Sequence, residues 1–210
     1  MPRVEAFDRY AEQYDAWFER HSCLYASELQ ALRTLLPEST RGIEIGVGSG
    51  RFALPLGIRW GADPSVRMLE MAEARGLEVV SARAEALPFK SSCFDLVLFV
   101  TTLCFLDDVE TALEEAYRVL GGTGTILIGM FDCGSPQGRS FIRGKRGKLF
   151  FQEARFYSVE STALLMGKLG FQHFEFRQTL RRPAIKIKQV EPLEKGYGEG
   201  LFVAIKAKKP

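Results

Sequence analysis

Three alternate glycines follow a short apolar segment, in the stretch Glu44-Ile45-Gly46-Val47-Gly48-Ser49-Gly50. Glycine has no Cβ, so a ligand can approach the backbone of such a turn very closely. The free amide groups of the turn, together with the N-terminus of a following helix, can hold an anionic group. Glycine-rich turns also occur for purely structural reasons, so this loop indicates a ligand site without defining the ligand.

Asp63 ends the next apolar segment, in Gly61-Ala62-Asp63-Pro64-Ser65. A carboxylate has two acceptor oxygens, and at the end of a strand it can take hydrogen bonds from both hydroxyls of a ribose. The alternative is that Asp63 only begins a proline-containing turn before a helix. Because the glycine loop precedes it, we favour the ribose interpretation.

Alternating strands and helices are predicted to position these residues. Apolar runs predict strands at 42–45, 58–62, 77–80, 94–100, 125–130, 171–176 and 201–207. Helical spacing predicts helices at 5–20, 24–36, 65–75, 107–120 and 158–169. Ser65, Asp107 and Ser158 are the expected N-caps. This order predicts an α/β fold with a mostly parallel sheet, helices on both faces, and a ligand site at the carboxyl ends of the strands.

Composition limits the class of protein. A chain of 210 residues with 46% hydrophobic residues suits a single domain, and a net charge of +2 is too small to indicate a polyanionic partner. The sequence contains no apolar run of about 20 residues, so we predict no membrane span. Glu5 and Asp8 lie where a signal peptide would be apolar, so we predict a cytoplasmic protein. Widely spaced cysteines predict reduced thiols and no metal site: Cys23, Cys93, Cys104 and Cys133.

Five short motifs follow one another along the chain: E-I-G-V-G-S-G, A-D-P-S-x-x-M-L-E-M-A, A-E-A-L-P-F, F-D-L-V and E-A-Y-R-V-L. In this order, between about Phe7 and Met130, they resemble the motifs of class I S-adenosylmethionine (SAM)-dependent methyltransferases, in particular the small-molecule and quinone-biosynthesis type. The resemblance implies a Rossmann-like, doubly wound sheet of seven mostly parallel strands, with an antiparallel last strand and an N-terminal helical cap. It implies one domain over residues 1–210: a cap (1–40), a cofactor-binding core (41–130), a substrate-side loop (131–157), and a C-terminal helix and strands (158–210).

The resemblance also implies which residues bind SAM. The glycine loop would lie against the methionine part of SAM, Asp63 would hold the ribose, and Thr101 and Thr102 would border the transfer site. Tyr14 would come from the cap, or it simply belongs to the buried face of a helix. The full expected set is Tyr14, Glu44, Gly46, Val47, Gly48, Gly50, Asp63, Pro64, Met68, Ala84, Glu85, Thr101 and Thr102.

Three positions depart from the family pattern. Arg83 stands where an acid is usual, and a guanidinium cannot accept a hydrogen bond from the adenine amino group, so backbone near Ala84 would have to replace that contact. Pro55 interrupts the short stretch before the second strand, which limits the first helix to one or two turns. Gly121-Gly122-Thr123-Gly124 replaces the usual Lys-Pro-Gly-Gly turn and keeps its glycines.

Methyl transfer from a sulfonium mainly requires alignment of the donor and the acceptor and the exclusion of water. A general base would help if the acceptor were a hydroxyl or a protonated amine. No catalytic residue is defined by the sequence, and the candidates are His21, Asp107 and Glu153. His21 lies between the first two helices, where a cap can bring it over the pocket, or it is a surface linker residue.

The 132–157 segment is predicted to cover the site, and it carries basic residues with no acid between them: Arg139, Arg143, Lys145, Arg146 and Lys148. They indicate an anionic small substrate, a solvated mobile loop or a nucleic acid. Thr101-Thr102-Leu103-Cys104 lacks the Asn/Asp-Pro-Pro-Tyr/Phe motif of amino-methylating DNA and RNA enzymes, which disfavours nucleic acid.

We therefore predict methyl transfer to a nitrogen, oxygen or carbon of a small molecule, by a monomer or homodimer with no membrane partner. The alternatives are an RNA methyltransferase, a non-catalytic SAM-binding module, and an NAD-dependent oxidoreductase. The G-x-G-x-G spacing and the lack of a Tyr-x-x-x-Lys relay count against the oxidoreductase.

Overall fold

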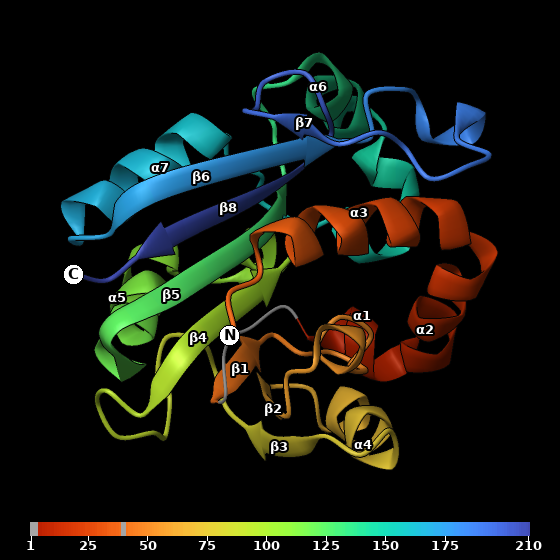
Figure 1. Ribbon diagram of the computed structural model, residues 1–210. Coiled ribbons are helices and arrows are strands. Elements are labelled where there is room, and N and C mark those ends of the chain that lie inside the picture. Colours follow the sequence, from red (N-terminus) through yellow and green to blue (C-terminus); the bar gives the residue numbers. More distant parts are fainter. Residues whose placement is uncertain (1–3, 39–40) are drawn as a thin grey trace.

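The structure, a computed structural model, describes residues 4–38 and 41–210. Its strands form one eight-stranded sheet in the order β3-β2-β1-β4-β5-β8-β6-β7 (Figure 1). Neighbours from β3 to β5 run parallel, and β8 runs antiparallel to both β5 and β6. The strands are β1 (Gly42–Ile45), β2 (Trp60–Asp63), β3 (Glu78–Ser81), β4 (Phe94–Val100), β5 (Leu120–Phe131), β6 (Gln172–Thr179), β7 (Glu194–Lys195) and β8 (Phe202–Lys208).

This architecture confirms the Rossmann-like α/β fold with an antiparallel last strand, and it adds the two-residue edge strand β7 to the seven strands expected. One boundary differs clearly from the prediction. β5 begins at Leu120 instead of Thr125, because Leu120 already pairs with Phe94 before the register shifts along β4. Gly121–Gly124 therefore lies within an irregular part of the strand.

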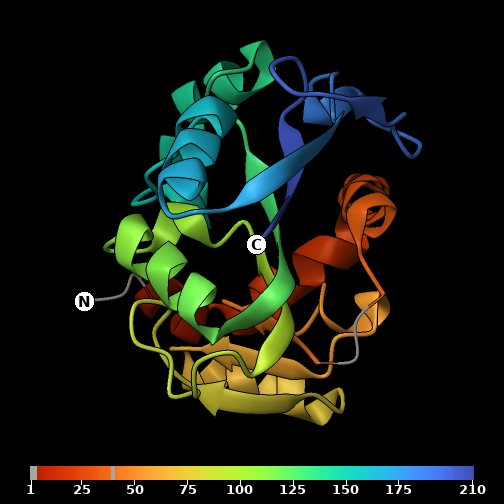
Figure 2. The same ribbon diagram turned by 60° about the vertical axis from the view of Figure 1, so that its left-hand side comes forward.

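Helices cover both faces of the sheet, and Figure 2 shows α5 and α7 on one side and α3 on the other. The alternation of β4 explains the two faces, since Phe99 packs in the core with α5 and α7 while Leu98 packs in the core with α3 and α4. The helices are α1 (Glu5–Arg9), α2 (Ala11–Arg20), α3 (Ser22–Leu35), α4 (Val66–Ala74), α5 (Val109–Val119), α6 (Pro136–Arg143) and α7 (Val159–Lys168). The part of the chain that the structure describes holds no helix long and apolar enough to cross a membrane.

Side-chain caps confirm two predicted helix starts and correct a third. Ser65 and Ser158 cap α4 and α7, as expected. The cap of α5 is Asp108, which accepts from the Thr111 amide at 3.2 Å, and not Asp107. The Asp107 carboxylate instead accepts a hydrogen bond from Arg83 at 2.9 Å. Two adjacent aspartates both satisfy a capping pattern, and the sequence alone does not choose between them.

One predicted helix is divided in two, and the segment after the glycine loop is as short as Pro55 led us to expect. The helix expected at 5–20 breaks at Tyr10, where φ is −125°, into α1 and α2. After the glycine loop the chain forms only a 3-10 turn, Leu54–Leu56, which contains Pro55 and ends at Gly57 with φ of +74°. Pro55 disfavours a longer helix because it lacks an N–H group. The loop must therefore present its own amides to a ligand, without a long helix behind it.

Candidate active site

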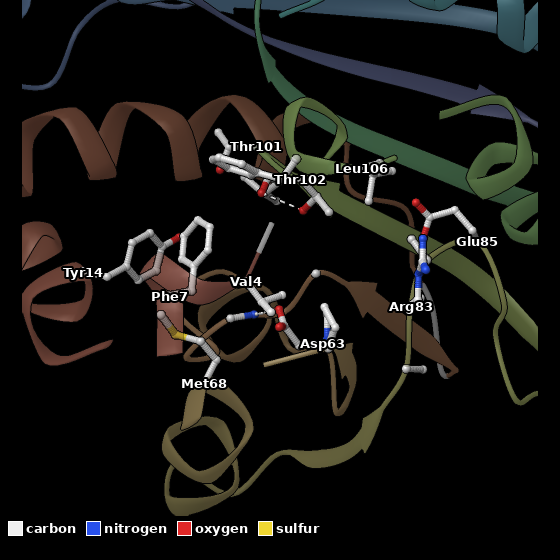
Figure 3. Close-up of a pocket in the computed structure, with 17 residues that line it drawn as sticks. Val4, Phe7, Tyr14, Asp63, Met68, Arg83, Glu85, Thr101, Thr102 and Leu106 are labelled. Carbon is white, nitrogen blue, oxygen red and sulfur yellow. Dashed lines mark hydrogen bonds and ion pairs between the residues drawn. The ribbon is translucent and has the colours of Figure 1, made fainter. Parts of the chain in front are cut away.

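Two cavities meet at the carboxyl ends of the parallel strands. The first, which we call the cleft, lies beside the glycine loop (Figure 3). It is lined by Val4, Phe7, Tyr14, Gly46, Gly48, Asp63, Pro64, Met68, Ala82, Arg83, Ala84, Glu85, Val100, Thr101, Thr102, Phe105 and Leu106. Most residues expected to bind SAM are thus brought together here, although they come from five separate stretches of the chain.

Asp63 is fixed at the end of β2 by two backbone amides. One of its carboxylate oxygens accepts from the Gly48 amide and the other from the Ser65 amide, both at 2.9 Å. The residue is only 8% exposed, and burial raises the pKa of its carboxyl to about 6, although these two amides lower it. Each oxygen accepts one hydrogen bond from the backbone and keeps acceptor capacity toward the cleft. Asp63 is therefore preorganised to receive hydroxyl donors.

The glycine loop turns sharply because its alternate glycines adopt left-handed backbone angles. The φ values are +73° at Gly46 and +51° at Gly48. A Cβ on Gly46 would lie 2.3 Å from Cγ2 of Thr102, so the loop sits directly against the end of β4. Among the described residues, a Cβ on Gly48 would meet within 4 Å only the Tyr14 ring, at 3.8 Å. The loop thus exposes backbone at Gly48 and packs against protein at Gly46.

Three residues of the expected set lie behind the cleft wall instead of lining it. Val47 packs over Gly61, because a Cβ added to Gly61 would lie 2.7 Å from the γ-carbons of Val47. Gly50 backs onto Leu77. Glu44 is 1% exposed, and burial raises the pKa of its carboxyl well above the ordinary value, while the Ala53 backbone opposes this. Its Oε2 atom is buried and has no hydrogen-bond partner among the described residues.

Asp15 of α2 braces the glycine loop, which the sequence did not indicate. Its carboxylate accepts from the Ser49 hydroxyl at 2.7 Å and from Nε of Arg51 at 2.8 Å. Arg75, just after α4, donates to it at 2.7 Å and also reaches the Ser49 carbonyl at 2.5 Å. One acid of the cap thereby joins α2, the loop and the end of α4.

Arg83 occupies the far end of the cleft, near Glu85 (Figure 3). Its guanidinium donates to Asp107 at 2.9 Å and lies 3.5 Å from Glu85. The Glu85 carboxylate in turn accepts from the Asp107 amide at 3.0 Å. Arg83, which stands where the family pattern has an acid, therefore forms a small charge network with Glu85 and Asp107.

Tyr14 belongs to both cavities and forms the wall between them. Its ring contacts Phe7 edge-on at 5.4 Å between centroids, and Phe150 at 5.3 Å. Burial raises the pKa of its hydroxyl far above the ordinary value, with Glu44 and Asp63 adding to this effect. The hydroxyl is therefore a neutral group at physiological pH.

The second cavity, which we call the aromatic cavity, has a volume of about 460 Å³. Its walls come from α2, α3, the end of β5 and the 141–151 segment, and it meets the cleft at Tyr14 and Thr101. It is lined by Gln13, Tyr14, Trp17, Phe18, Arg20, His21, Leu24, Glu28, Phe52, Thr101, Phe131, Phe141, Gly147, Lys148, Leu149, Phe150, Phe151, Leu180, Ala184 and Leu201.

The segment predicted to cover the site, which we call the cover, forms α6 and two 3-10 turns, Lys145–Gly147 and Leu149–Phe151, and part of it lines the aromatic cavity. Phe150 of this cover stacks on Phe7 of α1 at 5.4 Å between ring centroids. Phe141 packs against Phe131 at 5.0 Å. Contacts between these rings hold the cover against the cap and the sheet.

The candidate bases lie in different places. His21 lines the aromatic cavity, where it stacks on Trp17 and its Nδ1 lies 2.9 Å from the Trp17 carbonyl oxygen. Asp107 lies at the Arg83 end of the cleft, and Glu153 is exposed on the cover. Sequence reasoning missed Glu28, although an acid between Leu24 and Leu32 on the apolar stripe of a helix was a usable signal.

The residues that line the cleft fit SAM. A buried carboxylate with free acceptor capacity suits the two ribose hydroxyls. The missing Cβ at Gly48 leaves room at the loop beside Tyr14. Val4, Met68 and Leu106 supply apolar surface for a flat base.

Comparisons with known proteins agree with this geometry. A methyltransferase domain model matches residues 43–128. A SAM-dependent methyltransferase from Thermotoga maritima, described as a possible histamine N-methyltransferase, is 46% identical, with a TM-score of 0.95 over 99% of this chain and all (100%) of that one. An uncharacterised protein of Methanocaldococcus jannaschii is 42% identical over 98% of this chain and 100% of its own length. A ubiquinone/menaquinone biosynthesis C-methyltransferase of Xylella fastidiosa is 35% identical over 65% of this chain and 68% of its own length.

The chain therefore belongs to the class I SAM-dependent methyltransferases, and it is an enzyme that transfers the methyl group of SAM.

Proposed function

We propose that the methyl acceptor is a small molecule held in the aromatic cavity, while SAM occupies the cleft. The observation that carries this proposal is the cavity itself, whose volume of about 460 Å³ is in the range of small-molecule sites. It adjoins the cleft at Tyr14 and Thr101, and the cover shields it. The description of the Thermotoga protein, which names histamine as a possible acceptor, is consistent with it.

The residues of the cleft would act by binding and orientation. Asp63 would hold the ribose hydroxyls, Gly46 and Gly48 would lie along the methionine part, and Thr101 and Thr102 would border the transfer site. Bound SAM supplies a methyl group that its positive sulfur makes electrophilic. The remaining work of the protein is to align the acceptor and exclude water, which the aromatic rings around Tyr14 favour.

The basic residues of the cover support a small acceptor better than RNA, because several of them are engaged within the protein. Lys145 donates to the Ala154 carbonyl at 2.7 Å. The Lys148 ammonium lies 3.1 Å from the centroid of the Phe141 ring, and burial lowers its pKa to about 8. Arg139 donates to the Gly134 carbonyl. Such groups do not form the free basic surface that phosphate contacts require.

The test uses SAM with a tritiated methyl group, incubated with the enzyme and either a small-molecule extract or total RNA. We expect label in products of low molecular mass. Label in RNA, lost as salt is raised, would replace this proposal with an RNA methyltransferase. Absence of label from both, with binding of S-adenosylhomocysteine intact, would support a non-catalytic SAM-binding module.

The Asp63→Asn variant should bind S-adenosylhomocysteine about 5- to 150-fold more weakly at pH 7. This factor is equivalent to about 1–3 kcal/mol, the cost of losing buried hydrogen bonds.

In the wild type, the affinity for S-adenosylhomocysteine should fall as pH drops through about 6, because the protonated Asp63 carboxyl must lose its proton to accept hydrogen bonds from both hydroxyls. The variant should show no such fall. Calorimetric titrations at pH 5, 6 and 7 measure both effects.

The matched control is Asp108→Asn, which changes an exposed helix cap outside the cleft and keeps capping ability. It should bind S-adenosylhomocysteine like the wild type. An unchanged affinity in Asp63→Asn would remove the ribose assignment.

A further inference from the structure

Glu28 of α3 is a buried acid that faces the aromatic cavity. The residue is 2% exposed and lines that cavity together with Leu24, one helical turn before it. None of the described residues donates a hydrogen bond to its carboxylate or forms an ion pair with it. The acid therefore points into a ligand-sized space with its own bonding capacity unused.

Among the other buried acids of the described residues, Glu44 has one unpartnered oxygen but lies behind the cleft wall and lines neither cavity, and the following three are satisfied by the protein. Asp15 has three side-chain donors. Asp132 accepts from the amides of Gly134 and Val159, at 2.9 and 3.1 Å. Glu191 is paired with Arg182. Glu28 differs from them because no contact within the fold accounts for its presence, and an unsatisfied buried carboxylate destabilises a protein.

The charged and titratable groups around the cavity leave Glu28 without a counterion. Arg20 is directed back to its own helix, where it donates to the carbonyls of Ala16 and Gln13. His21 is held on Trp17, Lys148 lies over Phe141, and Tyr14 keeps its proton. Burial raises the pKa of Glu28 to about 8, so in the free enzyme the group holds a proton near neutral pH.

The surrounding rings favour a particular ligand. Trp17, Phe18 and Phe52 line the same cavity as Glu28, and aromatic faces attract cations. One carboxylate within an aromatic lining is suited to a protonated nitrogen attached to an apolar body, because charge pairing and ring contacts then act together. A carboxylate ligand would meet repulsion there, and a neutral alcohol would gain much less.

We infer that Glu28 is the acceptor-binding residue of this methyltransferase, and that the acceptor is a small amine whose protonated nitrogen pairs with the Glu28 carboxylate. This inference rests on the proposed function, since it places the acceptor in the aromatic cavity. An ammonium has no lone pair for attack, and Glu28 can take its proton. One N–H bond breaks, one O–H bond forms, and the proton later passes to water.

The experiment measures binding of three probes of matched shape to the whole enzyme saturated with S-adenosylhomocysteine, which prevents turnover. The probes are phenethylamine, phenethyl alcohol and hydrocinnamate. We expect the amine to bind most tightly, and Glu28→Gln to weaken the amine at least tenfold while the alcohol changes little. The control Glu114→Gln alters an exposed acid of α5 and should leave all three unchanged.

Proton release separates a ligand-binding role from a structural one. At pH 7 the free enzyme holds a proton on Glu28, so amine binding must release a proton to the buffer. The apparent binding enthalpy of the wild type should therefore differ between phosphate and Tris, and that of Glu28→Gln should not. A buried acid with only a structural role would give no such difference.

Several results would overturn the inference: equal or tighter binding of the alcohol or carboxylate, no binding of any probe, or full amine affinity in Glu28→Gln. Binding of S-adenosylhomocysteine serves as the folding control for each variant. The proposed function fails separately, by tritium label in RNA, so amine binding with label in RNA would leave the Glu28 site standing without the small-molecule activity.

Discussion

Replacing Asp15 with asparagine will lower the free energy of unfolding by about 3–5 kcal/mol, the usual cost of breaking a buried ion pair from one side. The Asp15 side chain is 12% exposed and pairs with both Arg51 and Arg75. Asparagine keeps the volume but leaves two guanidinium groups without their carboxylate. The glycine loop should loosen as well, because Ser49 loses its acceptor.

The pH dependence of this loss has a definite sign. Burial acts to raise the pKa of Asp15, but hydrogen bonds from Arg51, Ser49 and Arg75 together hold that pKa well below its ordinary value of 3.8. A depressed carboxyl pKa stabilises the fold above the unfolded value and loses this effect as pH falls below it. The difference between wild type and variant should therefore shrink below about pH 4.

Urea unfolding at pH 7 and pH 3 measures both statements. Glu12→Gln is the control, because the Glu12–Arg67 pair on the adjoining surface is exposed and exposed pairs contribute about 0–1 kcal/mol. A variant of Asp15 as stable as the Glu12 variant would show that the brace is unimportant. Weaker binding of S-adenosylhomocysteine is expected in Asp15→Asn and not in the control.

Gly46→Ala should abolish measurable methyl transfer, with binding of S-adenosylhomocysteine at least about 100-fold weaker, a loss of about 2.7 kcal/mol. Alanine at φ of +73° is strained, and its Cβ would lie 2.3 Å from Cγ2 and 3.0 Å from Cβ of Thr102. The β-carbon of Thr102 is fixed to the backbone, so a rotamer change alone does not relieve the contact. The end of β4 and the loop must move apart, which displaces both sides of the cleft.

Gly57→Ala separates the steric effect from backbone strain. Gly57 has nearly the same φ, +74°, and an added Cβ there meets no described atom within 4 Å. It should cost about 1–2 kcal/mol of stability and leave cofactor affinity unchanged. Calorimetry and thermal unfolding of the two variants provide the comparison. Equal cofactor affinity in both would mean that the Thr102 contact does not shape the cleft.

Local patterns predicted the sheet well. The apolar run Phe94–Val100 forms β4 with the expected bounds, since a central strand buried on both faces leaves a continuous signal. The predicted N-cap of α5 was less certain, because Asp107 and Asp108 are chemically equivalent. In the structure the Thr111 amide donates to Asp108, which is therefore the cap. The short strand β7 has a two-residue signal that no pattern can detect.

The site divides in the same way. Gly46, Gly48 and Asp63 line one cleft, as predicted from backbone shape and strand ends, which are local properties of the sequence. Asp15 was missed because its partners lie 34, 36 and 60 positions away. Phe150 was missed for a similar reason, as its meaning comes from the rings of Phe7 and Tyr14.

Tyr14 and Asp15 are consecutive residues of α2, yet one walls both cavities and the other holds the glycine loop. Any shift of this one helical turn acts on both cavities at once. With SAM in the cleft and the acceptor in the aromatic cavity, as proposed, the two binding equilibria are linked, and whatever factor SAM imposes on the affinity for the acceptor, the acceptor imposes on the affinity for SAM. A cap helix shared in this way makes cooperativity between the two substrates a property of a single chain, without a second subunit.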